Sequence, residues 1–147
     1  MREIIVGVDG SEHSYHALCW AMREAAEHNA ALTVMTVCPS PARPATMTFW
    51  GLPTLPEAKF NSERARRAVQ EAVDKAASEI SGTLPEVTVS VATGEATEEL
   101  VSASRDADLL VVGSRGTGGF SRLLLGSVSS QVMHHAACPV VVIPAAR

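Results

Sequence analysis

The sequence has little of several features that mark large classes of proteins. Aromatic residues make up 4% of its 147 residues, and its three cysteines form no Cys-x-x-Cys pair. No stretch approaches the roughly 20 apolar residues that a membrane-spanning helix requires. Met1, Arg2 and Glu3 lead directly into the apolar run 4–8, without the pattern of a secretory signal peptide. We therefore expect no membrane association and a cytoplasmic location.

The charged residues and the cysteines argue against two further functions. The chain has only two lysines, Lys59 and Lys75, with a net charge of −4 and a pI near 5.7. A nucleic-acid-binding surface needs a basic patch, so we expect no nucleic-acid partner. Cys19, Cys38 and Cys138 each lie in an apolar run, where free cysteine behaves as a small core residue. Buried thiols are usually inert, so we expect reduced, structural cysteines.

What is present is an alternation of strand-like and helix-like segments. Short apolar runs predict strands, and apolar residues at helical spacing predict helices. A chain of this length with 46% apolar residues builds one compact domain, so we expect a single domain over residues 1–147. The predicted strands are residues 4–8, 31–37, 87–91, 108–113 and 139–144, and the predicted helices are residues 14–28, 65–80, 97–105 and 127–136.

This order predicts an α/β fold with an open, mainly parallel sheet and helices on both faces, because parallel strands need crossover helices. Ligands of such sheets bind beyond the carboxyl ends of the strands, where the strand order changes direction. Asp9 follows the first predicted strand, and Gly113 ends the fourth. Both residues are therefore candidates for a ligand site.

Residues 39–60 form the longest irregular segment. They hold five of the eight prolines, and proline removes backbone donors and fixes φ, so we expect an irregular proline-rich loop. A loop of this length is uncommon inside a compact domain. Phe49 and Trp50 could cover a ligand or contact a partner chain, or the segment could be a surface loop without such a role.

The stretch from Gly113 to Ser127 carries most of the functional information. Glycine lets the backbone turn tightly and approach a ligand closely. Ser127 opens the last predicted helix, and the first amides of a helix point outward, where the helix dipole favours anions. The amides of residues 128–130 and the hydroxyl groups of Ser127 and Ser129 therefore predict a phosphate site.

Two common nucleotide fingerprints do not fit this chain. The Walker pattern places Lys and Ser or Thr directly after its second glycine, whereas Gly118 is followed by Gly119 and Phe120. The first strand leads into Val-Asp-Gly-Ser at residues 8–11 rather than Gly-x-Gly-x-x-Gly. Hydrolysis of the P-loop type and dinucleotide binding are both disfavoured.

Three blocks of the sequence resemble the universal stress protein family. We call Gly113, Gly116, Gly126 and Ser127 the glycine signature, and their spacing is that of the family. The opening Ile-Val-Gly-Val-Asp-Gly-Ser at residues 5–11 and the closing Cys-Pro-Val-Val-Val-Ile-Pro at residues 138–144 are similar as well. The resemblance covers the chain apart from the proline-rich loop, and the intact signature resembles that of the family's ATP-binding branch.

The resemblance implies an adenine-nucleotide alpha hydrolase-like fold with five strands in the order 3-2-1-4-5, and a site for ATP. Mg²⁺ is a candidate companion ion, because triphosphates normally bind together with it. It implies that Asp9 contacts the ribose or base, that the backbone around Val37 meets adenine and that Gly113 lies against the ribose. Arg115 could add charge. The residues that it implies for the phosphates are Gly116, Gly126, Ser127, Val128 and Ser129.

Simpler interpretations of the same residues stay open. Residues 9–11 could form only a turn with a helix N-cap, and Ser127 could be only a cap. Four histidines lack a further ligand at a recognisable zinc spacing, so we expect exposed helix residues rather than a metal site. These histidines are His13, His16, His134 and His135.

The predicted function is ATP binding by a nucleotide-dependent regulator or interaction module of the stress response. Any hydrolysis should be slow, because no Walker lysine and no evident general base stand beside the phosphate loop. The alternatives are a dimeric scaffold with a vestigial site and an enzyme that transfers adenylyl or phosphoryl groups. A homodimer is expected through the apolar run from Val140 to Ile143, an edge strand in the family order.

Overall fold

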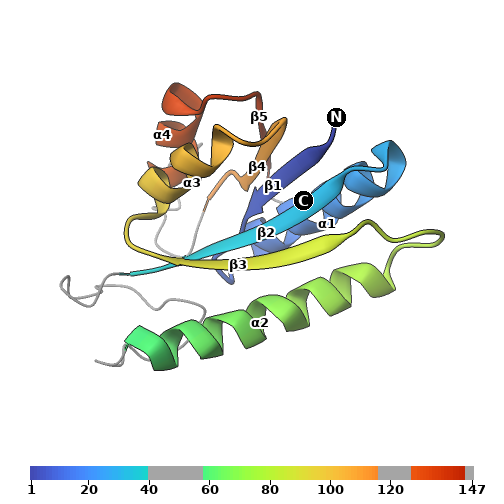
Figure 1. The fold of residues 1–147 in the computed structure, drawn as a ribbon, viewed down its shortest axis with the longest axis horizontal. Helices are drawn as coiled ribbons and strands as arrows, with labels where there is room; N and C mark the ends of the chain where they lie inside the picture. Colours follow the sequence, from blue (N-terminus) through green and yellow to red (C-terminus); the bar gives the residue numbers. More distant parts are fainter. Residues whose placement is uncertain (40–57, 116–126, 145–147) are drawn as a thin grey trace.

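The computed structural model describes residues 1–39, 58–115 and 127–144 (Figure 1). Within these ranges strands and helices alternate along the chain. The strands are β1 (Glu3–Gly7), β2 (Ala31–Cys38), β3 (Val87–Thr93), β4 (Leu109–Gly113) and β5 (Val140–Ile143). The helices are α1 (Glu12–His28), α2 (Ala58–Ser78), α3 (Ala96–Ser104) and α4 (Ser127–His135).

The five strands form one parallel sheet in the order β3-β2-β1-β4-β5. β1 lies at the centre, where Val6 pairs with Val34 of β2 and with Val111 of β4. The central strands read as continuous apolar runs because helices cover both of their faces. The predicted fold class, an α/β domain with strand order 3-2-1-4-5, is confirmed.

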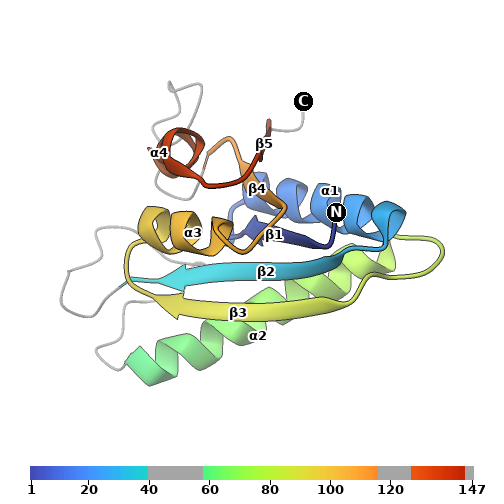
Figure 2. The ribbon, with the colours of Figure 1, turned by 45° about the horizontal axis from the view of Figure 1, so that its top comes forward.

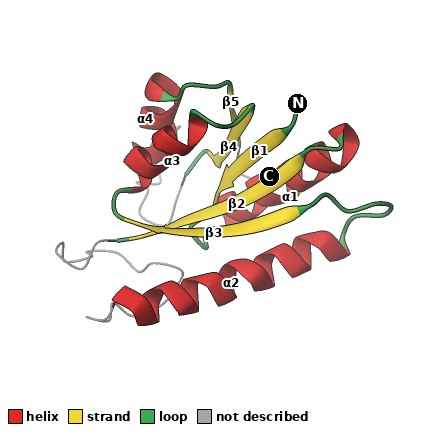
Figure 3. Cartoon of the chain, in the orientation of Figure 1, coloured by secondary structure: helices red, strands yellow, loops and turns green. Residues whose placement is uncertain are grey.

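Two helical layers enclose the sheet (Figures 2 and 3). α1 and α2 pack on one face, and α3 and α4 pack on the other. Ile4 and Val6 of β1 join the core under α1 and α2, whereas Ile5 joins the core under α3 and α4, because successive strand residues point to opposite faces. No helix within the described ranges is long and apolar enough to cross a membrane.

α1 begins at Glu12, two residues before its predicted start. Ser11 is the N-cap, and its side chain accepts a hydrogen bond from the backbone N–H of Ser14 at 3.2 Å. This cap satisfies one of the N–H groups that the start of a helix leaves without a partner. After His28, Asn29 adopts the left-handed conformation, with a φ of 52°, that ends many helices.

α2 begins at Ala58, so the last three residues of the predicted loop 39–60 are helical. The predicted boundary is wrong because Pro56 is the last proline of the segment, and Ala58 and Lys59 beyond it are good helix formers. Residues 40–57, which include Phe49 and Trp50, lie outside the described residues.

Candidate functional site

The carboxyl ends of β1, β2 and β4 meet at one edge of the sheet (Figure 2). Asp9 lies two residues beyond β1, Val37 is the last residue but one of β2, and Gly113 ends β4. α1 leads from β1 to β2 on one face, whereas α3 leads from β3 back to β4 on the other. The strand order therefore changes direction between β1 and β4, the location at which open α/β sheets bind ligands.

Residues 9–11 form the turn that joins β1 to α1. The Asp9 carboxylate accepts a hydrogen bond from the backbone N–H of Ser11 at 3.0 Å, and Gly10 has a φ of 87°. Glycine adopts a positive φ without steric cost, so the sequence Asp-Gly-Ser suits this turn. The predicted turn and the predicted N-cap are both confirmed. A carboxylate accepts several hydrogen bonds, so a ligand contact by Asp9 is compatible with the turn and stays a prediction.

The end of β2 extends beyond β1. The ladder between them ends with Gly7 beside Met35, and the Val8 N–H donates to the Met35 carbonyl at 2.9 Å. The Val8 carbonyl then accepts from Thr36 Oγ1 at 2.8 Å. Alternate residues of a strand face opposite neighbours, so the backbone groups of Val37 point to the same side of β2 as those of Met35, the side of β1. The ladder with β1 has already ended before the level of Val37. The adenine contact that the resemblance implies for this backbone stays a prediction.

Gly113 lies directly against the first turn of α1. A Cβ at this position would stand 2.8 Å from the carbonyl carbon and the carbonyl oxygen of His13, and 3.1 Å from the backbone nitrogen of Ser14. These atoms belong to the helix backbone and cannot rotate away. Packing within the protein therefore requires glycine at position 113. The contact of Gly113 with a ribose stays a prediction.

Hydrogen bonds hold the segment after Gly113 to β5 and to α4. The Ser114 N–H donates to the Ile143 carbonyl at 2.8 Å, and the Ser114 carbonyl accepts from Ser129 Oγ at 3.1 Å. Ser114 and Ser129 are both buried, and Arg115 is half-buried. Ser129, a predicted phosphate ligand, thus has a structural role as well, because its hydroxyl fixes the start of the glycine stretch.

α4 begins at Ser127, as predicted, with Ser127 exposed and Val128 half-buried. Because Ser129 binds Ser114, the first turn of α4 lies beside the end of β4. The structure thus brings the start of α4 to the same edge as Asp9, Val37 and Gly113. The other two glycines of the signature, Gly116 and Gly126, lie outside the described residues.

Sequence reasoning missed two hydroxyl side chains at this edge. Ser14 Oγ accepts a hydrogen bond from the Asp9 N–H at 3.2 Å, and Thr36 Oγ1 caps the Val8 carbonyl. Ser14 stands on the apolar face that α1 turns to the core, with Ala17 and Leu18. A lone serine on an apolar helix face is a pattern that could have identified it, because a buried hydroxyl needs a partner.

All four of these histidines were predicted to be exposed. The prediction is confirmed for the two in α4 and is wrong for the two in α1. His134 and His135 are exposed, as predicted. His13 and His16 are half-buried, and within the described part of the chain their Nδ1 atoms are buried without a hydrogen-bond partner. The prediction is wrong for these two, and for His13 the reason is that its backbone packs closely against Gly113 at the end of β4. Among the described residues no group of three or more His, Cys, Asp or Glu side chains could hold a metal ion.

The three cysteines are free thiols. Cys19 and Cys38 are buried, and Cys138 is half-buried. Burial raises the pKa of each thiol above its usual value, and a protonated thiol is a poor nucleophile. These environments agree with the prediction of reduced, structural cysteines.

Comparison with known proteins identifies the family. The sequence model described as "Universal stress protein family" matches residues 1–144. The chain belongs to the universal stress protein family. A universal stress protein of Mycolicibacterium smegmatis is 36% identical over 143 residues, which cover 95% of this chain and 47% of that relative. This universal stress protein chain therefore spans about half the length of the curated relatives that it matches.

Solved structures of universal stress proteins share the fold. The universal stress protein UspA from Lactobacillus plantarum matches with a TM-score of 0.79 at 25% identity, over 97% of this chain and 97% of that chain. A universal stress protein in complex with cAMP matches with a TM-score of 0.71 at 25% identity, over 99% of this chain and 98% of that chain. The similarity thus extends over nearly the full length of both solved chains.

Proposed function

We propose that this universal stress protein chain binds ATP where β1, β2 and β4 end, and that it acts as a nucleotide-dependent regulatory or interaction module in the stress response. In this proposal Asp9 contacts the ribose or base, the Val37 backbone meets adenine and Gly113 lies against the ribose. The residues proposed for the phosphates are Gly116, Gly126, Ser127, Val128 and Ser129, with Arg115 nearby. We also propose a cytoplasmic location, which the three free thiols support, because oxidising compartments favour disulfides.

The observation that carries the proposal is that the first turn of α1 supports two predicted ligand residues at once. Asp9 donates its N–H to Ser14 Oγ, and Gly113 packs against the peptide between His13 and Ser14. The residue proposed for the ribose or base therefore has a fixed position relative to the first glycine of the signature. Preorganised groups of this kind bind ligands at a lower entropic cost.

The comparisons support an adenine nucleotide as the ligand class. A structure similar over nearly the whole chain is a complex with cAMP, which contains the adenine, ribose and phosphate that ATP also contains. The choice of ATP rests on the intact glycine signature, because three glycines before a helix start suit a longer phosphate chain.

We propose that hydrolysis is slow at most. Neither lysine of the chain lies in the glycine stretch, and lysine is the residue that stabilises the phosphates in P-loop enzymes. Mg²⁺ prefers oxygen ligands and usually binds through one or two carboxylates together with substrate phosphates. Asp9 offers one carboxylate for such an ion, and phosphate oxygens would supply further ligands.

Calorimetric titration with ATP tests the proposed site. We expect the parent protein to bind ATP and Asp9→Asn to bind it more weakly, because the amide can still accept the Ser11 hydrogen bond but lacks the charge that strengthens bonds to ribose hydroxyl groups. Asp106→Asn removes the same charge from an exposed residue that precedes β4, and should bind as the parent does. Equal affinity of Asp9→Asn and the parent would show that Asp9 is not a ligand residue.

We further propose a homodimer that forms through β5, the edge strand next to β4. Its four residues are apolar and half-buried. Leu110 N–H donates to the Pro139 carbonyl, and Ser114 N–H donates to the Ile143 carbonyl. By the alternation of the ladder, the backbone groups of Val142 face away from β4. An apolar edge with outward N–H and C=O groups can pair with a second copy of the chain.

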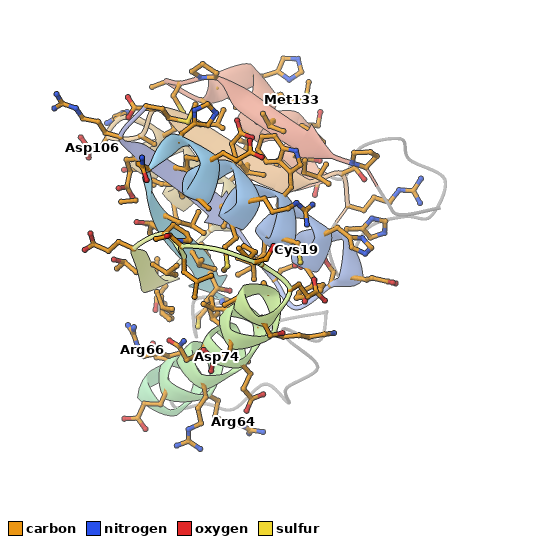
Figure 4. The ribbon with its side chains drawn as sticks, turned by 90° about the vertical axis from the view of Figure 1, so that its right-hand side faces the viewer. Cys19, Arg64, Arg66, Asp74, Asp106 and Met133 are labelled. Carbon is orange, nitrogen blue, oxygen red and sulfur yellow. The ribbon has the colours of Figure 1, made fainter. Side chains whose placement is uncertain are left out.

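The other edge strand of the sheet, β3, is less suited to such pairing. Arg66 of α2 donates from Nη1 to the Val89 carbonyl of β3 at 3.1 Å (Figure 4). Because Leu32 N–H donates to the Glu86 carbonyl, Val89 belongs to the residues of β3 that face away from β2. A charged side chain thus covers part of this edge, as in many protected edge strands.

Sedimentation equilibrium of Val142→Pro tests the dimer. The substitution removes one outward N–H, and proline is tolerated at such edge positions. We expect the parent to be a dimer at micromolar concentration and Val142→Pro to be a monomer with unchanged circular dichroism. Val142→Thr keeps the N–H and the β-branched shape, so it should remain a dimer. A monomeric parent, or a Val142→Pro variant that dimerises equally well, would contradict the proposed interface.

A further inference from the structure

Ser14 is a buried serine on a helix face that is otherwise apolar. The residue is 5% exposed, and Ala17, Leu18 and Ala21 further along the same face are fully buried core residues. Burying a hydroxyl costs free energy unless it finds hydrogen-bond partners. The partners of Ser14 therefore indicate why a serine occupies this position.

Ser14 binds both ends of the turn between β1 and α1. Its Oγ accepts a hydrogen bond from the Asp9 N–H at 3.2 Å and donates one to the Ser11 carbonyl at 3.0 Å. Its own N–H donates to Ser11 Oγ at 3.2 Å. A single side chain thus connects the residue that leaves the strand with the residue that caps the helix.

The hydrogen bond from Asp9 takes the place of the next rung of the sheet. Asp108 N–H donates to the Glu3 carbonyl, so the odd-numbered residues of β1 face β4. The pairing of β1 with β4 ends at Val6 beside Val111. Asp9 lies beyond that end, and its N–H donates to Ser14 Oγ instead. Ser14 therefore helps to set the direction in which the chain leaves β1 at Asp9.

We propose that Ser14 is a positioning residue that fixes Asp9 for the nucleotide and acts through Asp9, an inference that rests on the proposed function for the role of Asp9. Ser14 holds the Asp9 backbone, while the Ser11 N–H holds its carboxylate at 3.0 Å. Without the Ser14 hydroxyl, the Asp9 N–H loses this acceptor and the turn gains freedom. The carboxylate must then be ordered when the ligand binds, which costs affinity.

The first turn of α1, which carries Ser14, also contacts Gly113, where the glycine stretch begins. A Cβ on Gly113 would stand 3.1 Å from the Ser14 nitrogen, so the peptide that carries Ser14 is in contact with the start of the glycine stretch. Ser14 thus lies between the Asp9 turn and the end of β4.

Ser104 is a matched control elsewhere in the chain. It is 1% exposed, its Oγ donates to the Val101 carbonyl at 2.6 Å, and it accepts from the Ala137 N–H at 2.9 Å. Ser14 and Ser104 therefore share the same chemistry: each donates to the carbonyl three residues earlier and accepts from a loop N–H. Ser104 ends α3 and binds the connection between α4 and β5, a different part of the protein from the Asp9 turn.

A double-mutant cycle measured by calorimetry with ATP tests the inference. We expect Ser14→Ala to weaken ATP binding about tenfold, the size of effect that loss of one hydrogen bond produces, and Ser104→Ala to leave the affinity unchanged. In an Asp9→Ala background, Ser14→Ala should cause no further loss, because coupled residues are not additive. Unchanged affinity of Ser14→Ala, or an equal loss in the Asp9→Ala background, would overturn the proposed role.

Amide hydrogen exchange provides a measurement that needs no ligand. We expect the Asp9 amide to exchange about tenfold faster in Ser14→Ala but not in Ser104→Ala, and the Ala137 amide to show the reverse. If the parent binds no ATP, the proposed function fails, and exchange at Asp9 still decides whether Ser14 fixes the turn. Unchanged protection of Asp9 in Ser14→Ala would overturn the inference even where ATP binds.

Discussion

Gly113 lies so close to α1 that a Cβ at this position would stand 2.8 Å from the carbonyl oxygen of His13. The first glycine of the signature is therefore needed by the fold itself. Gly116 and Gly126 lie outside the described residues, and their expected role with the phosphates rests on the sequence. Substitutions at the three glycines should thus have different consequences.

We predict that Gly113→Ala destabilises the protein by about 1–3 kcal/mol, the usual cost of overpacking. Gly7→Ala is the matched control, because the atoms nearest to its Cβ would be side-chain carbons of Leu100, the first two at 3.1 Å, and a side chain can move. Urea unfolding of both variants measures the difference. A Gly113→Ala variant as stable as Gly7→Ala would show that α1 yields readily at this contact.

We predict that Gly116→Val and Gly126→Val abolish ATP binding while the fold survives. A β-branched side chain would intrude where the backbone is expected to meet phosphate, and it fits poorly at unusual φ values. Circular dichroism checks the fold, and calorimetry checks the affinity. Folded variants that bind ATP as tightly as the parent would place the nucleotide elsewhere.

Asp108 ties the start of β1 to β4, and we predict that this contribution depends on pH. Its carboxylate accepts hydrogen bonds from the N–H groups of Arg2 at 2.8 Å and Glu3 at 2.9 Å, which lower the pKa of Asp108. A lowered pKa in the folded state stabilises the protein above the unfolded value of about 3.9, and the contribution is lost as the pH falls through the folded pKa.

Asp108→Ala should therefore lower Tm at pH 7 and make Tm less sensitive to pH below about 4. Asp106→Ala removes the same charge from an exposed residue two positions earlier and controls for net charge. Thermal unfolding across this pH range measures both variants. If the two variants had the same pH dependence, the hydrogen bonds of Asp108 would contribute nothing to stability.

Tyr15 and Cys19 of α1 form a cluster with Glu79, the residue that follows α2. Tyr15 Oη lies 3.5 Å from Glu79 Oε1, and Cys19 Sγ lies 3.7 Å from Glu79 Oε2. Burial raises the pKa of Tyr15, and its hydrogen bonds and charge interactions with Cys19 and Glu79 raise it further. The folded protein therefore holds this proton more tightly than the unfolded chain does, so its stability is lost progressively as the pH rises from the unfolded pKa of about 10 through the folded pKa.

Because Tyr15 is the only tyrosine of the chain, absorbance at alkaline pH reports its ionisation alone. We predict that Tyr15 of the parent ionises at a higher pH than an ordinary tyrosine does. In Glu79→Gln, Tyr15 should ionise at a lower pH than in the parent. Glu86→Gln, at another exposed glutamate, should titrate as the parent does. An identical titration curve for Glu79→Gln and the parent would rule out the contribution of Glu79.

The strands and helices could be predicted from the sequence because their apolar periodicity is regular. The strand order came from the family resemblance, since periodicity does not determine which strands are neighbours. The observed helix boundaries differ from the predicted ones where local chemistry sets them. At Glu12, for example, the Ser11 cap starts α1 earlier than its apolar residues indicate. At Ala58, helix propensity beyond the last proline had the same effect.

For the candidate site, the positions of Asp9 and Gly113 at the carboxyl ends of strands could be predicted, because Asp9 follows the apolar run of β1 and Gly113 ends that of β4. The roles of Ser14 and Ser129 could not be predicted in this way. Ser14 meets Asp9 only because the turn at residues 9–11 directs the first turn of α1 back to the end of β1, and Ser129 meets Ser114 only once α4 packs beside β4. Half-burial of His13 likewise depends on how closely α1 approaches the end of β4.

Identification of the bound nucleotide tests the central claim most directly. The purified protein would be denatured, released nucleotides would be identified by mass spectrometry, and the stripped protein would be titrated with ATP, GTP, NAD and flavin. We predict that the protein carries or takes up ATP in preference to the other three. Tight binding of NAD or flavin with none of ATP would contradict the proposed function, and binding of no nucleotide would indicate a scaffold with a vestigial site.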